Sequence, residues 1–521
     1  MKRLIVLAPA ITGKTARWQP LKQRLEAEPT LAGAQWLLWD HHAWPWTLRT
    51  PEALSNDLCA RIDTQWRANN GFDEIILVGH SLGGVLIRYA FLLGSGVLDT
   101  HPRQEEWCKR VRRFVLFASV NRGFNPNNLH ALRFLYLLWR FLPTNRRTLV
   151  NTVKAGSDFI TDLRIQWIRH FKNLGERAPE VVQLLGTEDG IVTREDSRDV
   201  TQFPNAEEID VPGANHADIY RLEKAEDPES RYCLIRDAFV KPIENRPSTH
   251  APAPRNPVFF ILHGIRANNS QWVEQARARI VRRSPNAEVV VSSYGYLPAF
   301  DFMIPPWRNR NIEWFKDMYS YYYAMYPNAE FHFLGHSNGT YLLGKSLERV
   351  PGMRFGRIVL VGSVLPRNYP WAQIFDRDQV KILRNDRANR DVPVGILCSA
   401  LRGFGMRALG TAGVDGFDFN DERTSEVFYY DGGHSKALSE SNIENLVDYL
   451  LSGFGDDKKR EELCQNRPAP IFGFCSRTAP LLAYVLLGAL GVLIWCLVDS
   501  WLAAVVAIAI TVLVIVLART I

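Results

Sequence analysis

Two five-residue segments of this 521-residue chain each combine a serine with the glycines that would expose its hydroxyl for chemistry. The first is Gly79-His80-Ser81-Leu82-Gly83, after the apolar run 75–78, and the second is Gly335-His336-Ser337-Asn338-Gly339, after 331–334. Both fit G-x-S-x-G, a sharp turn from strand to helix. The serine there has a strained backbone, and side chains two residues away would collide with the neighbouring strand and helix. Two copies in the same context predict two serine nucleophiles.

A serine hydroxyl becomes a strong nucleophile only when a base takes its proton and a carboxylate orients that base. In the first half, Asp189 lies in the loop after the apolar strand that begins at Val181, and His216 follows the strand 207–211. We therefore predict Ser81 as nucleophile, His216 as general base and acid, and Asp189 as orienting acid. Glu188 is the nearest alternative to Asp189.

The second half offers a parallel set around Ser337. His434 follows the strand 426–430, in the position that His216 has in the first half. For the acid we choose Asp391, because Asp391-Val392-Pro393-Val394 echoes the sequence that begins at Asp189. Asp386 and Asp415 remain alternatives.

An acyl-transfer site also needs two backbone N–H donors for the oxyanion. One is expected from the residue after each nucleophile, Leu82 or Asn338. The other is expected from the loop after the first strand of each half, at Ile11 or Ile265. The two loops differ in sequence, with Pro9-Ala10 before Ile11 and His263-Gly264 before Ile265. The loop geometry can therefore differ between the halves.

The elements that must position these residues are also duplicated. The runs 2–8 and 258–262 predict a first strand in each half, and 113–120 and 357–364 predict the strand after each serine helix. Strands alternating with helical segments favour a parallel sheet with helices on both faces. The repeat has the length of a domain, not of a solenoid unit.

With these motifs the chain resembles the α/β-hydrolase superfamily, and within it the lipases and esterases, over residues 1–243 and 257–455. In that superfamily the chain order is Ser, acid, His, and His263-Gly264-Ile265 resembles the His-Gly-x loop of lipases. The resemblance implies two tandem α/β-hydrolase domains that cleave an ester through an acyl-serine intermediate, with no metal or organic cofactor. It does not identify the substrate.

Composition shifts mark the predicted boundaries. Residues 244–256 are rich in Pro and polar residues and predict a linker. Domain one carries an insertion at about 122–178, where the superfamily places its lid, and its segment 129–142 predicts a largely apolar helix. That helix either lies in a membrane interface or is buried over the pocket.

The end of the chain predicts a membrane anchor. A basic segment, 456–480, precedes two uncharged apolar runs, 481–498 and 501–518. Each is long enough to cross a bilayer, so 481–518 predicts a transmembrane helical hairpin. The basic flanks place the catalytic domains on the cytoplasmic side.

The composition, 46% hydrophobic and 22% charged, is typical of globular domains, and the net charge of +7 suits an anionic membrane surface. No nucleic-acid-binding module is present, and seven scattered cysteines without C-x-x-C spacing indicate free thiols and no metal site. The sequence predicts a membrane-anchored serine hydrolase of esters, a lipid or another acylated molecule near the bilayer being favoured as substrate. The alternatives are a thioesterase or amidase, and a tethered binding module in which one or both domains are inactive.

Overall fold

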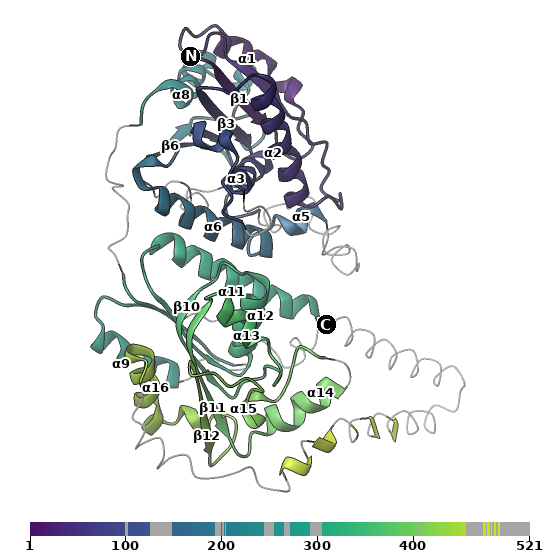
Figure 1. Cartoon of the computed structure of the whole chain (residues 1–521), viewed down its shortest axis with the longest axis vertical. Coiled ribbons are helices and arrows are strands. Elements are labelled where there is room, and N and C mark those ends of the chain that lie inside the picture. Colours follow the sequence, from purple (N-terminus) through teal and green to yellow (C-terminus); the bar gives the residue numbers. More distant parts are fainter. Residues whose placement is uncertain are drawn as a thin grey trace. The chain divides into compact units, whose positions relative to one another are not determined.

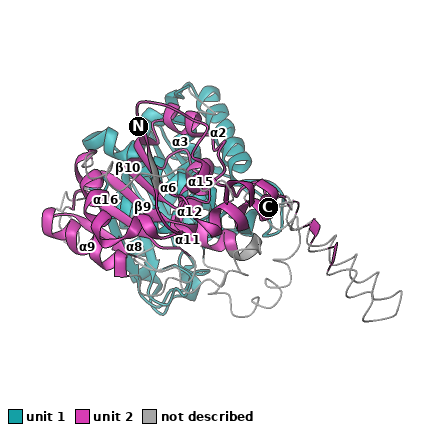
Figure 2. Cartoon of the chain, turned by 90° about the horizontal axis from the view of Figure 1, so that it is seen from below, with its two compact units in different colours: residues 1–253, 316–327 teal, residues 254–315, 328–521 magenta. Residues whose placement is uncertain are grey.

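The computed structural model divides the chain into two compact units (Figure 2). It describes residues 1–98, 103–124, 148–192, 200, 203, 205–243, 255–264, 271–291, 305–403 and 406–454, with short pieces between 472 and 489. Unit 1 comprises Met1–Ala253 and Lys316–Pro327, and unit 2 comprises Pro254–Phe315 and Asn328–Ile521.

The second segment of unit 1 lies within the range 257–455 that the sequence assigned to domain two. Within unit 1, Asp317 accepts a bidentate hydrogen bond from Arg122, from Nε at 3.0 Å and Nη2 at 2.8 Å, and a further one from Arg164 at 3.3 Å. Arg164 Nη1 also donates to Ser320 Oγ at 2.6 Å. These polar contacts join the segment to the N-terminal residues of unit 1.

Unit 1 is built on a six-stranded, fully parallel sheet in the order β2-β1-β3-β4-β5-β6 (Figure 1). Its strands are β1 (Arg3–Ala8), β2 (Gln35–Leu38), β3 (Glu74–His80), β4 (Val111–Phe117), β5 (Glu180–Gly186) and β6 (Ala206–Val211). All six carboxyl ends therefore meet at one edge of the sheet, as the alternation of strands and helices predicts.

Helices cover both faces of this sheet. Leu4 and Val6 of β1 pack with α2 (Pro51–Ala68), α3 (Leu82–Gly94) and α6 (Asp158–Leu174). The alternate residues Ile5 and Leu7 pack on the other face with α1 (Gln19–Glu26) and α8 (Pro228–Val240). Both faces are apolar because a parallel strand is buried on both sides.

Unit 2 contains a second six-stranded parallel sheet, in the order β12-β11-β10-β9-β7-β8. Its strands are β7 (Val258–Leu262), β8 (Glu288–Val291), β9 (Phe331–His336), β10 (Phe355–Val361), β11 (Val380–Ala388) and β12 (Thr424–Tyr430). Counted from the first strand of each unit, the two sheets have the same strand order. The repeat seen in the sequence is therefore also a repeat of topology.

The helices of unit 2 repeat the two-faced arrangement. Phe259 of β7 packs with α9 (Gln271–Arg283) and α16 (Glu440–Ser452). Phe260 points to the other face, where its ring meets Phe315 of α11 (Pro305–Met325) with centroids 5.7 Å apart. The described part of unit 2 also includes α12 (Asn338–Arg349), α13 (Trp371–Asp376), α14 (Ser399–Gly403), α15 (Ala412–Asp415) and a π-helical turn (Pro393–Cys398).

The structure confirms the predicted α/β class with parallel sheets and adds two strands that the sequence analysis missed. β2 and β8 are edge strands of four residues each, and none of the described residues of β2 is fully buried. Such short, half-exposed strands carry neither the continuous apolar run nor the length that marks a central parallel strand.

Two predicted segments fall largely outside the described residues. The predicted lid helix 129–142 lies outside them, whereas the later part of the insertion forms α5 (Leu149–Thr152) and α6, whose Trp167 and Phe171 are buried. Most of the predicted hairpin 481–518 also lies outside them. Within the described part of the chain, no helix is both long and apolar enough to span a membrane.

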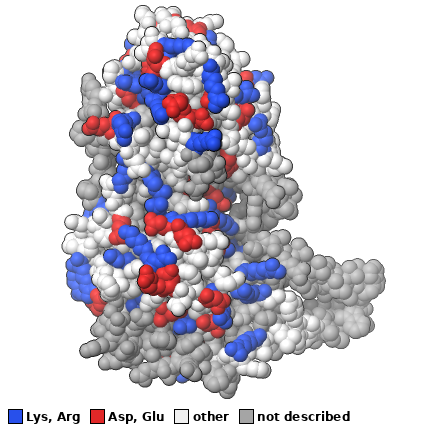
Figure 3. Space-filling view, viewed as in Figure 1, with Lys and Arg blue, Asp and Glu red and all other residues white. Residues whose placement is uncertain are grey.

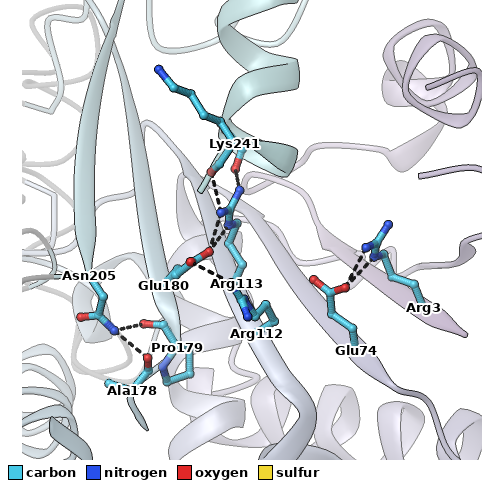
Figure 4. Close-up of polar contacts among 10 residues, drawn as sticks. Arg3, Glu74, Arg112, Arg113, Ala178, Pro179, Glu180, Asn205 and Lys241 are labelled. Carbon is cyan, nitrogen blue, oxygen red and sulfur yellow. Dashed lines mark hydrogen bonds and ion pairs between the residues drawn. The ribbon is translucent and has the colours of Figure 1, made fainter. Parts of the chain in front are cut away.

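Charged side chains of both signs are interspersed on the face shown in Figure 3. Several charged side chains form ion pairs between neighbouring strands of unit 1. Arg3 and Glu74 are register partners on β1 and β3 and are joined at 2.7 Å. Arg113 and Glu180 are register partners on β4 and β5 and also form an ion pair (Figure 4). Both pairs lie at the amino-terminal end of the sheet and hold its register.

Arg113 carries more of this arrangement than its neighbour Arg112. Its guanidinium also donates to the carbonyl oxygens of Ala238 at 3.1 Å and Lys241 at 2.7 Å, at the end of α8. The Arg113 side chain is 5% exposed, whereas that of Arg112, which donates to the same Glu180, is 60% exposed. Arg113 therefore joins two strands and a helix terminus in a dry environment.

We expect Arg113→Met to destabilise unit 1 by about 3 kcal/mol, because Glu180 keeps only the exposed Arg112 as its partner and two carbonyl oxygens lose their buried donor. Arg112→Met, the matched control, should cost no more than about 0.5 kcal/mol, since its pair with Glu180 is solvated. Hydrogen–deuterium exchange of β4 and β5 measures both effects. Equal losses in the two variants would contradict this role for Arg113.

Candidate active site

Ser81 occupies the turn between β3 and α3, with φ +54° and ψ −115°. This is a conformation that side-chain-bearing residues rarely adopt. The helix can follow at once because Gly83 has no side chain: a Cβ there would lie 2.0 Å from the carbonyl oxygen of Ala8. The serine is therefore held at the carboxyl end of the sheet by the close approach of α3 to β1.

The structure brings Ser81, His216 and Asp189 together in one hydrogen-bonded chain. His216 follows β6 and Asp189 follows β5, so both loops lie at the edge where β3 delivers the serine. His216 Nε2 lies 2.8 Å from Ser81 Oγ, and His216 Nδ1 lies 2.9 Å from Asp189 Oδ2. In the tautomer that fits both contacts, the Nδ1–H group of His216 donates to the Asp189 carboxylate, and Nε2 accepts the proton of the Ser81 hydroxyl.

Asp189 is set up as a charged acceptor. Its side chain is fully buried, and its other oxygen, Oδ1, accepts from the amides of Ile191 at 2.8 Å and Val192 at 3.0 Å. Burial by itself raises the pKa of Asp189, but the hydrogen bond and charge of His216 and these amides outweigh it and hold the pKa below its ordinary value. Glu188, the alternative acid, is exposed to solvent.

In unit 2 Ser337 repeats the turn, with φ +54° and ψ −119°, between β9 and α12. His434 Nδ1 lies 2.8 Å from Asp391 Oδ2, and Asp391 Oδ1 accepts from the amide of Val394 at 3.0 Å. The other two candidate acids are engaged elsewhere. Asp386 is buried in an ion pair with Arg384, and Asp415 accepts a hydrogen bond from Thr411.

The two units differ at the contact between histidine and serine. Among the described residues, no hydrogen bond joins His434 to Ser337, although the His434–Asp391 pair is in place. The residue after the fourth strand also differs. It is Ala118 in unit 1 and Gly362 in unit 2, both with positive φ, and a Cβ on Gly362 would lie 2.9 Å from the His434 ring.

The predicted oxyanion donors lie beside each serine where the structure describes them. Leu82 and Asn338 directly follow the two serines and are the first residues of α3 and α12. In unit 1 the loop that carries Ile11 runs past this helix start, since a Cβ on Gly83 would also lie 2.7 Å from the Pro9 carbonyl oxygen. In unit 2, Gly264 lies against Ser337, and Ile265 is outside the described residues.

The sequence analysis did not assign a role to the histidine that precedes each serine. His80 Nε2 lies 2.8 Å from the main-chain carbonyl oxygen of His216, and His336 Nε2 lies 3.3 Å from that of His434. His80 therefore holds the loop that carries His216, and His336 holds the loop that carries His434. The signal was present in the sequence, because both serine turns have His at the same position.

Aromatic rings enclose both of these histidines. Trp18 meets His80 edge-on at 6.1 Å between centroids, and Trp272 meets His336 in the same way at 6.3 Å. In unit 1 Trp18 also stacks on Tyr220 at 3.9 Å. Burial, with a smaller contribution from the charge of the neighbouring histidine, lowers the pKa of both His80 and His336 to about 3, so both are neutral donors at pH 7.

Within the described part of the chain, no group of three or more His, Cys, Asp or Glu side chains is placed to bind a metal ion. The arrangement around Ser81 can activate a serine. Ser81 has a base within hydrogen-bonding reach, the base has a buried carboxylate, and the first amide of α3, that of Leu82, directly follows the serine. Those are the parts required for nucleophilic acyl transfer.

Comparisons with known proteins found no matching family model and no matching curated protein. Solved structures do match. They include a monoacylglycerol lipase of Paleococcus ferrophilus, 18% identical over 44% of this chain and 92% of its own, with a TM-score of 0.29. A phospholipase of Legionella pneumophila is 15% identical over 36% and 40%, with a TM-score of 0.26. A thermophilic esterase of Thermogutta terrifontis is 12% identical over 46% and 89%, with a TM-score of 0.30.

We predict that His80 makes unit 1 less stable as the pH falls. Its pKa is about 3 in the folded state against 6.5 as the ordinary value, so between these pH values only the unfolded chain binds the proton. The free energy of unfolding should therefore fall with pH below 6.5, by about 1.4 kcal/mol per pH unit for this group.

This slope is measured by unfolding the protein in urea at pH values between 7.5 and 4.5, with hydrogen–deuterium exchange reporting the unfolding of unit 1. His80→Gln, which cannot take up a proton but can still donate to the His216 carbonyl, should reduce the slope, and the part that remains is expected from His41 and His170, whose pKa values are also lowered by burial. His42→Gln, at an exposed histidine, is the control and should leave it unchanged. A slope in His80→Gln equal to that of the wild type would contradict the prediction.

Proposed function

We propose that this chain is a serine hydrolase that cleaves carboxylic esters through an acyl-serine intermediate at Ser81. The observation that carries the proposal is the continuous hydrogen-bonded chain from Ser81 Oγ through His216 to the buried carboxylate of Asp189. Its geometry matches the requirement that a base lie within hydrogen-bonding reach of the nucleophile and be oriented by a third group.

In the proposed reaction Ser81 Oγ attacks the ester carbonyl carbon while its proton passes to His216 Nε2. The imidazolium is stabilised by Asp189, and the negative oxygen of the tetrahedral intermediate accepts from the N–H groups of Leu82 and Ile11. The leaving alcohol takes the proton from His216. Water then attacks the acyl-serine, with His216 as base, and releases the acid and the free serine. A thioester or amide would be attacked by the same residues.

Ser337, His434 and Asp391 are proposed as a second site of the same kind in unit 2, with Asn338 and Ile265 as its oxyanion donors. The His434–Asp391 pair supports this assignment. The missing hydrogen bond to Ser337 favours a second candidate for unit 2 alone, a binding module that keeps the fold and does not turn over. Apo sites can close such bonds when substrate arrives, so an experiment must decide.

Labelling with a fluorophosphonate probe, which reacts with base-activated serines, tests both assignments. We expect the wild type, Ser81→Ala and Ser337→Ala to label and the double variant not to. Labelling should be faster in Ser337→Ala, which keeps the complete Ser81 site, than in Ser81→Ala. Asp189→Asn in the Ser337→Ala background should slow the labelling of Ser81 by about 10⁴-fold, because the imidazole loses its orienting carboxylate.

Glu188→Gln in the same background is the matched control, since this carboxylate is adjacent in sequence but exposed. It should label at the wild-type rate. If Ser81→Ala abolishes all labelling, unit 2 is the binding module. If the wild type does not label, the hydrolase proposal fails.

We further propose that the chain is an integral membrane protein, held by a hairpin of two spans over 481–518, with both units on the cytoplasmic side. The proposal rests on the sequence: 481–498 and 501–518 contain no charged residue, and Lys458, Lys459 and Arg460 precede them. Its substrate would then be a lipid or another acyl ester near the bilayer.

Alkaline carbonate extraction of membranes from expressing cells tests the anchor. The full chain should stay with the membranes, and a chain ending at residue 480 should be released. Protease added to intact cells should leave both units uncut until the cells are permeabilised. Release of the full chain by carbonate, or cleavage in intact cells, would contradict the anchor or its orientation, respectively.

A further inference from the structure

The loop after β2 in unit 1 exposes three large apolar side chains in a row. Trp44, Trp46 and Leu48 are 63%, 58% and 62% exposed, at alternate positions of one short segment. Ala43, just before them, is buried. Among the described residues of unit 1, the other exposed large hydrophobic residues are Met1 at 81% and Val97 at only 37%, and each stands alone. Three exposed large apolar side chains on one loop form an apolar patch, which is uncommon on a protein surface that faces water.

This segment, which we call the tryptophan loop (residues 44–48), has a defined shape. The amide of Thr47 donates to the carbonyl oxygen of Trp44 at 3.0 Å, which closes a β-turn with Pro45 as its second residue. Proline fixes φ at that position, so the turn is rigid. The two indoles are therefore presented on a preformed turn.

Both flanks of the tryptophan loop are fastened to unit 1. On one side, buried His41 donates from Nε2 to the Pro9 carbonyl oxygen at 3.1 Å, with Nδ1 accepting from the amide of Ala43. On the other, the carbonyl oxygens of Pro45 and Thr47 accept from Val150 and Leu149 at 3.1 and 3.0 Å. These hydrogen bonds hold the backbone of the loop to the rest of unit 1, while Trp44, Trp46 and Leu48 remain exposed.

The same fastening places the tryptophan loop beside the proposed active site. Pro9 belongs to the loop that carries Ile11, the proposed oxyanion donor, and the amide of Thr12 donates to the carbonyl oxygen of Ala43 at 3.1 Å. A surface that receives Trp44 and Trp46 would therefore lie next to the rim of the Ser81 site.

The chemistry of the loop fits a lipid surface. Indole rings combine an apolar body with one polar N–H and concentrate at membrane interfaces. The sequence has no acidic residue between Asp40 and Glu52, and the Asp40 carboxylate accepts from the amide and hydroxyl of Thr15. Arg49 next to the loop and Lys14 on the neighbouring segment are exposed cations that suit anionic headgroups.

We propose that Trp44, Trp46 and Leu48 insert into the headgroup region of an anionic bilayer and dock unit 1 on it, with the Ser81 site at the lipid surface. The consequence for substrate, that unit 1 takes its ester from the bilayer, rests on the proposed function. The docking itself does not depend on hydrolysis.

Vesicles of phosphatidylcholine and phosphatidylglycerol with brominated acyl chains test the docking, because bromine quenches indole fluorescence only within the bilayer. The full chain in the Ser337→Ala background is reconstituted into them. Trp44→Ser/Trp46→Ser should lose quenchable emission equal to about that of two of the 15 tryptophans, whatever the contribution of Trp495 and Trp501. Val97→Ser, at an exposed apolar residue elsewhere in unit 1, is the control. Equal thermal unfolding of the three proteins excludes misfolding.

A kinetic readout tests the consequence for substrate. The double variant should hydrolyse a long-chain ester embedded in the vesicles about tenfold more slowly, since it lacks two large apolar contacts with the bilayer. A soluble short-chain ester should be hydrolysed at the parent rate. If no protein hydrolyses either ester, the proposed function fails, and the quenching still decides the docking.

Unchanged quenching in Trp44→Ser/Trp46→Ser would overturn the proposal. If quenching is unchanged, analytical ultracentrifugation in detergent then shows whether the double variant has a different oligomeric state. Such a difference would mean that the loop binds another copy of the chain.

Discussion

The arrangement of each unit depends on one strained residue, the serine that joins strand to helix with positive φ. Its backbone is held from the neighbouring strand: the amide of Ser81 donates to the Phe117 carbonyl oxygen, and that of Ser337 to Val361, each at 3.0 Å. The helix that follows must then pass the end of the first strand, where a side chain on Gly83 or Gly339 would meet a main-chain oxygen. Strand order, glycine positions and the serine turn are therefore one linked constraint.

A second principle recurs around unit 1: buried side chains donate to the carbonyl oxygens of loops and of a helix end. His80 holds the His216 loop, His41 holds the loop after β1, and Arg113 holds the end of α8. A loop carbonyl removed from water needs a donor, and a side chain from a strand or its flank supplies one with fixed geometry. The proposed catalytic groups are thus positioned by contacts that themselves take no part in proton transfer.

The sequence predicted the parts of the fold that depend on local pattern. β7 has the predicted bounds, and the central strands before each serine were marked by continuous apolar runs that end in a glycine-bearing turn. The edge strands β2 and β8 could not be found in this way, because four half-buried residues carry no distinct pattern. The pairing of Asp317 with Arg122 and Arg164 joins residues 195 and 153 positions apart, which no local pattern reveals.

For the site, residue type and chain order were enough to bring Asp189, His216 and Ser81 onto one list, but not to give their distances. The choice among Asp391, Asp386 and Asp415 needed the third dimension, since only a folded chain shows that Arg384 already neutralises Asp386. The repeated histidine before each serine is visible in the sequence, but the contact of His80 with the His216 carbonyl is not. It joins a side chain to a main-chain atom 136 residues away, and main-chain atoms leave no signature in sequence.

At the residue after the fourth strand, the two units accommodate their histidine loops differently. In unit 2 the absence of a side chain at Gly362 leaves the space that the His434 ring and the Asp391 carboxylate occupy, whereas unit 1 carries a methyl group there, on Ala118. A chimera that grafted the histidine loop of one half onto the other would meet a steric clash or leave a void at this position. The two copies are therefore alike in architecture without having interchangeable parts.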